Sequence, residues 1–289
     1  MERQPVSLTF DIEDWTHPEL VRTKVAPGEE RTVVREGTEA ILNVLERHGV
    51  RGTFFILGDV ARRFPDLVRR IAGAGHEIAS HGYSHTPLWQ LDPESLRAEL
   101  RNFRTAIRDA LGEDRVRGFR APTFSIDRST AWALKVLAEE GFDYDSSIFP
   151  MKVKVYGVSG VPLGIYRPAA DDLGRHDPDG PLVEFPVAVH HIGGFHLPIA
   201  GGFYLRALPF GVTQASLDAI LVRRPANLFL HPWECVANVP RVRLGAVARF
   251  ITYVNLSGVL AKLDRVAARY NIRPMIEILE DAGHLRRSV

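Results

Sequence analysis

Apolar runs of strand length alternate with amphipathic stretches through much of the chain. The runs predict strands at residues 6–10, 52–57, 76–80, 117–119 and 227–230. Apolar residues at helical spacing predict helices at residues 33–48, 65–74, 92–111, 127–141, 212–223 and 256–270. Because strands and helices follow one another in turn, the pattern predicts an α/β fold with a parallel sheet or barrel.

This alternation breaks between residues 151 and 210, which are rich in glycine, proline and β-branched residues. Their composition predicts loops and hairpins inserted at the rim of the fold. From about 240 to 289 we expect a C-terminal helical extension, within which MIEILEDAG (275–283) predicts one more strand and a turn. No stretch has the composition of a linker, so residues 1–289 are expected to form one domain.

Charge and cysteine content narrow the possible partners and the compartment. The 289 residues include 36 Lys and Arg against 35 Asp and Glu, which argues against nucleic acid as a partner. Cys235 is the only cysteine, which excludes an intrachain disulfide and fits a reducing compartment. No apolar run approaches 18 residues, and the start MERQPVSLTFD lacks the pattern of a signal peptide. We therefore expect no transmembrane segment and a cytoplasmic location.

Polar residues suited to chemistry follow four of the predicted strands. Asp11 continues the first strand, His81 the third and Arg120 the fourth, and His231 follows the strand at 227–230. The carboxyl ends of parallel strands share one face of the fold, and that face hosts the active site. The sequence therefore predicts that these four side chains converge.

Two clusters among these residues point to a metal site. His81 and His85 in SHGYSH are four residues apart and can present both imidazoles to one side if the segment turns like a helix. The first strand runs into three acids, Asp11, Glu13 and Asp14. Taken alone, the histidine spacing fits an incidental pair and the acids fit a solvated turn. Together they favour a site with one carboxylate and two histidines, which is typical of a catalytic divalent ion.

With these residues identified, the chain resembles the NodB-type polysaccharide deacetylases of carbohydrate esterase family 4. The motifs occur in the family's order: TFDIED (9–14), TFFILG (53–58), SHGYSH (80–85), FRAPTFSI (119–126), DYDSSIFP (143–150) and FLHPWE (229–234). The chain is most similar to an intracellular branch associated with exosortase and exopolysaccharide loci, through EFP (184–186), GGFYLR (201–206) and HPWE (231–234). The resemblance implies a distorted (β/α) barrel with the 151–210 insertion at its rim.

The resemblance also implies roles for individual residues. Asp11 would be the catalytic base, and Arg120 would hold that base in place. His231 would be the general acid. One divalent ion, zinc, would be bound by His81, His85 and either Glu13 or Asp14. The substrate-binding residues would be Tyr83, Pro122 and Trp233.

Two positions depart from the family pattern. The usual adjacent acids are replaced by Asp-Ile-Glu-Asp, and Glu13 is favoured over Asp14 as the ligand because it shares a strand face with Asp11. Gly82 stands where the family has Ser or Thr after the first histidine, so the support is expected from Ser80 or Ser84.

The activity that the resemblance implies is metal-dependent removal of N-acetyl groups from amino sugars of a polysaccharide or its lipid-linked precursor. N-acetylated carbohydrate is then the expected partner. Alternatives are an allantoinase-like cyclic-amide hydrolase on the same fold and a non-catalytic carbohydrate-binding relative; the complete set of motif residues weighs against both. The insertion contains the aromatic residues Tyr156, Tyr166, Phe195, Phe203 and Tyr204. They either stack on sugar rings or pack together in a small core of the rim itself.

Overall fold

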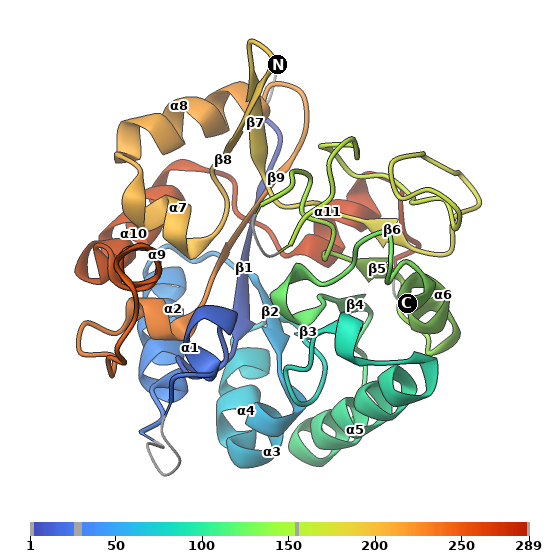
Figure 1. Cartoon of the computed structure of the whole chain (residues 1–289), viewed down its shortest axis with the longest axis horizontal. Helices are drawn as coiled ribbons and strands as arrows, with labels where there is room; N and C mark the ends of the chain where they lie inside the picture. Colours follow the sequence, from blue (N-terminus) through green and yellow to red (C-terminus); the bar gives the residue numbers. More distant parts are fainter. Residues whose placement is uncertain (1–2, 26–30, 154–155, 288–289) are drawn as a thin grey trace.

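The computed structural model describes residues 3–25, 31–153 and 156–287, which fold around one curled parallel sheet (Figure 1). In this part of the chain the strand order is β6-β5-β4-β3-β2-β1-β9. The strands are β1 (Val6–Ile12), β2 (Thr53–Ile56), β3 (Glu77–Ser80), β4 (Gly118–Phe119), β5 (Tyr144–Asp145), β6 (Val183–Glu184) and β9 (Ala226–Leu230). A separate antiparallel hairpin consists of β7 (Val189–Ile192) and β8 (Phe195–Pro198).

Helices connect the strands and cover the outside of the sheet (Figure 1). The α-helices are α1 (Glu19–Arg22), α2 (Val34–Arg47), α3 (Gly58–Arg63), α4 (Pro65–Gly73), α5 (Pro93–Leu111), α6 (Trp132–Glu139), α7 (Gly202–Ala207), α8 (Phe210–Ile220), α9 (Ala246–Tyr253), α10 (Val259–Arg269) and α11 (Met275–Asp281). Short 3₁₀ turns are η1 (Leu88–Gln90), η2 (Pro122–Phe124), η3 (Pro232–Cys235) and η4 (Leu256–Gly258).

The two outer strands of the sheet approach each other through the residues that follow β6. The backbone N–H of Ala188 donates to the carbonyl of Asn227 in β9 at 2.8 Å, and the Asn227 side chain reaches the carbonyl of Phe185 at 3.3 Å. The sheet is thus a distorted barrel, and the predicted α/β fold class is confirmed.

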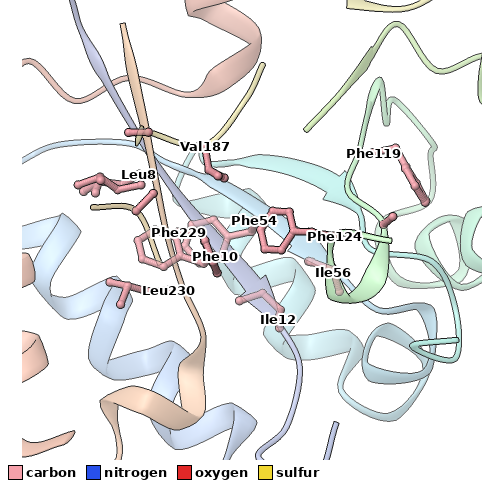
Figure 2. Packing of buried hydrophobic residues seen from close by; sticks show 14 of the residues in the cluster. Leu8, Phe10, Ile12, Phe54, Ile56, Phe119, Phe124, Val187, Phe229 and Leu230 are labelled. Carbon is pink, nitrogen blue, oxygen red and sulfur yellow. The ribbon is translucent and has the colours of Figure 1, made fainter. Parts of the chain in front are cut away.

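Alternate residues of β1 enter two different environments. Phe10 packs against Phe54 of β2 with ring centroids 4.9 Å apart, within the hydrophobic cluster of Figure 2. Thr9 and Asp11 point to the opposite face, because side chains alternate along a strand, and both accept hydrogen bonds from Arg120 there. β1 therefore supplies the apolar core on one face and a polar network inside the barrel on the other.

Several predicted elements are confirmed, and their boundaries follow from local chemistry. The Asp92 side chain accepts a hydrogen bond from Ser95 N–H at 2.7 Å, and α5 ends at Gly112, whose φ of +80° suits glycine. Asp127 instead closes a turn with Ser129, so the helix predicted from 127 begins only at Trp132.

The strand expected in the tail is wrong. Residues 275–281 form α11, which follows Pro274 and buries Met275, Ile278 and Leu279. These three positions have the i, i+3, i+4 spacing of one helical face. In so short an apolar run this spacing does not distinguish a helix from a strand.

The 151–210 region is more than an insertion of loops. It includes the hairpin β7–β8 and α7, but it also supplies β6, which pairs with β5 in the main sheet. Residues 154–155 of this region lie outside the described residues. The expectation of a single domain stays a prediction.

By length and composition, one helical stretch of 24 residues, Ala246–Arg269, is apolar enough to cross a membrane. In the structure this stretch is interrupted: α9 ends before Asn255, whose φ is +46°, and α10 starts four residues later. The apolar residues of α10 that pack inside the protein are Val259, Leu263, Val266 and Ala267. Packing inside the protein therefore accounts for part of this apolar composition, since 22% of the most apolar window of the stretch is buried.

Candidate active site

The four side chains expected to converge do so at the carboxyl ends of their strands. Asp11 lies near the end of β1, and His81, Arg120 and His231 directly follow β3, β4 and β9. Arg120 Nη1 is 2.6 Å from Asp11 Oδ1, and His231 Nε2 is 3.9 Å from Asp11 Oδ2. Parallel topology places these residues on one face of the fold, and the curl of the sheet brings Arg120 to Asp11 across the two strands between them.

Glu13, His81 and His85 form a buried cluster that could hold a metal ion. Their ligand atoms all lie within 4.8 Å of one another. Glu13 Oε2 is 2.5 Å from His85 Nε2 and 3.9 Å from His81 Nε2. One carboxylate and two imidazoles is a donor set that suits zinc or a similar ion, so the residues fit the implied cofactor.

The ring of His81 is held ready for a ligand. Its Nδ1 lies 2.8 Å from the carbonyl of Arg120, and because a carbonyl only accepts, Nδ1 carries the proton and Nε2 keeps its lone pair. Burial lowers the pKa of His81 to about 4, so the ring is neutral at neutral pH, the form that binds metals.

Asp14 stands apart from this cluster. Its Oδ1 accepts hydrogen bonds from the backbone N–H groups of Trp15 at 2.9 Å and Val33 at 3.1 Å. The carboxylate thus ties the end of β1 to the start of α2. Of the two acids that the sequence left open, Glu13 is the one that lies with the histidines.

Asp11 and Arg120 form a fully buried ion pair within a polar network. Besides Asp11, Arg120 donates to Thr9 Oγ1 at 2.9 Å and to the hydroxyl and carbonyl of Ser146 at 2.9 and 3.0 Å. Its guanidinium also lies over the ring of Phe55 at 4.1 Å. Arg120 therefore compensates the charge of Asp11 and fixes its orientation.

His231 is held by Glu234, a contact that sequence reasoning missed. Glu234 Oε2 lies 2.9 Å from His231 Nδ1, and Arg206 Nε donates to Glu234 Oε1 at 2.9 Å. Burial alone lowers the pKa of His231, but the negative charges of Glu13 and Glu234 outweigh it and raise the pKa to about 9. His231 is thus held protonated, with Nε2 facing the cluster, 3.6 Å from Glu13 Oε1.

The packing around Glu234 explains the glycines of GGFYLR. A Cβ on Gly202 would lie 1.7 Å from Glu234 Oε2, so any side chain there would displace the carboxylate. The signal available in the sequence was the pairing of GGFYLR with HPWE, but no spacing rule connects residues so far apart.

The loop that carries His81 and His85 is irregular and does not turn like a helix. Gly82 has φ of +77° and His85 has φ of +61°, neither of which fits a right-handed helix. Ser80 Oγ accepts the N–H of Gly82 at 3.2 Å, as expected for support from Ser80. The larger support comes from Glu99 of α5, which sequence reasoning missed.

Glu99 fastens this loop to α5 through three hydrogen bonds. Its Oε2 accepts the N–H groups of Tyr83 at 2.9 Å and Ser84 at 2.8 Å, and Oε1 accepts the hydroxyl of Ser84 at 2.8 Å. The Tyr83 N–H is therefore already engaged inside the protein.

A cavity of about 320 Å³ opens above the cluster. It is lined by Asp11, Glu13, His81, His85 and His231, together with apolar and aromatic side chains. Its described lining includes Trp233, which stacks on His231 at 5.7 Å, but neither Tyr83 nor Pro122.

The five aromatic residues considered for sugar stacking divide into two groups. Tyr156, Phe203 and Tyr204 line the cavity. Tyr166 is buried and donates from its hydroxyl to the carbonyl of Leu173 at 2.8 Å, while Phe195 is 80% exposed on the hairpin. Only the first group is placed to meet a ligand.

Comparison with known proteins gives this site a family. A peptidoglycan deacetylase-like protein of Gibberella zeae is 36% identical over 134 residues, which cover 45% of this chain and 38% of that protein. A chitooligosaccharide deacetylase of Rhizobium leguminosarum bv. trifolii is 38% identical over 101 residues, covering 35% of this chain and 44% of the other. The chain thus spans less than half the length of these curated relatives.

The solved structures share the fold. A protein assigned as a polysaccharide deacetylase from Mycobacterium smegmatis superimposes with a TM-score of 0.64 at 24% identity, covering 100% of this chain and 98% of the other. A family 4 pseudoenzyme from Bacillus anthracis superimposes with a TM-score of 0.50 at 16% identity, over 96% of this chain and 66% of the other.

Family models match both halves of the chain. Residues 1–143 match the family described as Polysaccharide deacetylase, and residues 146–280 match Domain of unknown function (DUF3473). The chain therefore contains a polysaccharide deacetylase domain of the NodB type. The resemblance is confirmed at this level.

Proposed function

We propose that this protein is a metal-dependent hydrolase that removes N-acetyl groups from amino sugars of a polysaccharide or its lipid-linked precursor. The observation that carries the proposal is the buried cluster of Glu13, His81 and His85, with Asp11 and His231 Nε2 beside it. EFP, GGFYLR and HPWE, with the match over residues 146–280, support an exopolysaccharide-associated branch. The single, buried Cys235 supports a cytoplasmic site of action.

Glu13, His81 and His85 would hold one divalent ion, zinc. A bound ion of this kind lowers the pKa of water and polarises a carbonyl group. Asp11 takes the proton of the attacking water, and Arg120, which donates a hydrogen bond to its Oδ1, orients that carboxylate. The neutral Nε2 of His81 stays available because its Nδ1–H is bound to the carbonyl of Arg120.

His231 donates the proton that the leaving amine needs. Glu234, 2.9 Å from Nδ1, favours the protonated form of the ring and fixes the direction of Nε2. A positioned general acid contributes about 10²–10⁴-fold to rate. The sugar ring would lie among Trp233, Tyr156 and Phe203, whose faces suit stacking.

Acetate release from N-acetylglucosamine oligomers and from lipid-linked N-acetyl sugars tests the proposal. Activity should vanish with a chelator and return with zinc. His231→Ala should keep the metal but lose amide hydrolysis by orders of magnitude, while an activated ester, which needs no protonated leaving group, suffers much less. Equal damage to both substrates would remove His231 from the acid role.

A further inference from the structure

The short helix α9 is oriented with its apolar side outward. Val247 is 73% exposed and Phe250 is 56% exposed, whereas Thr252 on the opposite side is buried. A surface helix of a globular protein normally does the reverse and buries its apolar face. α9 lies at the edge of the molecule in Figure 1. Its exposed face therefore fits contact with something apolar.

The sequence that flanks α9 carries only positive charge. No acidic residue occurs from Cys235 to Leu263, while arginines stand at positions 241, 243 and 249. Arg241 lies over the ring of Tyr253 at 5.3 Å. Arg243 and Arg249 are exposed, and within the described residues neither forms an ion pair. Basic side chains beside exposed apolar ones suit a membrane surface, where negatively charged headgroups cover an apolar interior.

α9 also forms part of the rim of the active-site cavity. Ile251 and Thr252 line that cavity, and Phe250 lies 6.1 Å from Phe203, which lines it too. Arg206 donates to the carbonyls of Ile251 at 2.9 Å and Val254 at 2.6 Å while it holds Glu234. Whatever binds the outer face of α9 is thus held next to the cavity and the residues that orient His231.

We propose that α9 and its flanking arginines dock the protein on the surface of an anionic bilayer, with the cavity facing a substrate carried by that membrane. This rests on the proposed function and narrows its substrate to the lipid-linked class. A second copy of the chain is the poorer partner, because a two-fold interface through α9 would oppose like charges. Insertion across the bilayer is disfavoured by the break at Asn255 and the buried face of α10.

Sedimentation with vesicles tests the docking without any turnover. The full chain should bind phosphatidylcholine vesicles that contain about one-third phosphatidylglycerol, bind pure phosphatidylcholine far less, and lose affinity as salt rises. Val247→Asp should weaken binding about tenfold or more. Arg243→Glu with Arg249→Glu should weaken it by more than about 25-fold, since each arginine near the surface contributes about fivefold.

Val212→Asp is the matched control, because Val212 is 39% exposed on another helix, α8. This variant should bind vesicles like the wild type. All variants should keep wild-type thermal unfolding, and Val247→Asp should keep wild-type acetate release from a soluble oligomer. If neither the wild type nor any variant releases acetate, the proposed function is wrong. The vesicle measurement still tests the docking by itself, because it does not depend on turnover.

Three results would overturn the docking: equal weak binding to anionic and neutral vesicles, unchanged binding in the Val247 and arginine variants, or a dimer in solution that Val247→Asp dissociates. The last would identify a second copy as the occupant.

Discussion

One oxygen of Glu234, Oε2, contacts two atoms of His231: it accepts the backbone N–H at 3.0 Å and lies 2.9 Å from Nδ1. Since Oε1 is bound by Arg206, the carboxylate cannot turn away. A histidine whose Nδ1 faces a carboxylate has Nε2 directed at the reaction and its protonated form stabilised.

Glu234→Gln should therefore lower the pKa of His231 from about 9, because one of the two negative charges that outweigh its burial is removed. The basic limb of the pH–rate profile should move to lower pH, and kcat should fall about tenfold or more. Gly202→Ala, whose new Cβ would collide with the same carboxylate, should shift the limb in the same direction. If Glu234→Gln folds and the basic limb of its pH–rate profile does not move, the role of Glu234 is to cap η3 and not to raise the pKa of His231.

Glu13→Gln and Asp14→Asn form a matched pair, because each exchanges one carboxylate for an amide on adjacent residues. Glu13→Gln should lower zinc affinity by more than about a hundredfold, since it removes the anionic member of the cluster. Asp14→Asn should keep one metal ion per chain, because its remaining oxygen can still accept the N–H groups of Trp15 and Val33. Elemental analysis after dialysis measures both, and metal loss in Asp14→Asn alone would reverse the assignment.

The sequence predicted the convergence of Asp11, His81, Arg120 and His231 because parallel strands place their carboxyl ends on one face of the fold. The curl of the sheet then brings Arg120 of β4 to Asp11 of β1, although two strands lie between them. The sequence could not predict that Glu99 supports the histidine loop or that Arg206 holds Glu234. Both contacts join residues far apart in the chain, so they leave no local sequence pattern.

Backbone conformation explains the other failures. The helical spacing of His81 and His85 suggested a helical turn, but their meeting depends on the positive φ of Gly82 and His85, which spacing does not reveal. A positive φ at a non-glycine such as His85 is a costly conformation that persists at functional sites. The tail predicts a strand because the short run MIEIL (275–279) fits either element, and Pro274 before it is the available sign of a helix start.

Arg120→Lys should destabilise the fold as well as reduce activity. A lysine keeps the positive charge but cannot reproduce all of the bonds to Asp11, Thr9 and Ser146, so its cost should lie below the roughly 3–5 kcal/mol of removing one partner of a buried ion pair. Asp11→Asn should cost less stability, because its amide oxygen can still accept from Arg120, yet it should lose more than about a hundredfold in rate. Urea unfolding and acetate release separate the two effects. Wild-type stability in Arg120→Lys would contradict the structural role.

The EFP motif yields a prediction about stability and pH. Glu184 of β6 lies directly opposite Asp145 of β5, and both side chains are fully buried. Burial, and then the negative charge of Asp145, raise the pKa of Glu184 well above its ordinary value. The folded protein thus keeps a proton on this pair that the unfolded chain releases above about pH 4.3.

Folding stability should therefore fall as pH rises above the unfolded pKa, by up to about 1.4 kcal/mol per unit until the folded pKa is reached. Glu184→Gln cannot ionise, so it should be more stable than the wild type at pH 8, and its advantage should shrink as pH falls toward 5. Glu277→Gln, which alters a partly exposed glutamate on α11, is the control and should follow the wild-type slope. Urea unfolding across this range gives the slopes, and parallel curves for Glu184→Gln and the wild type would mean that Glu184 is ionised in the native state.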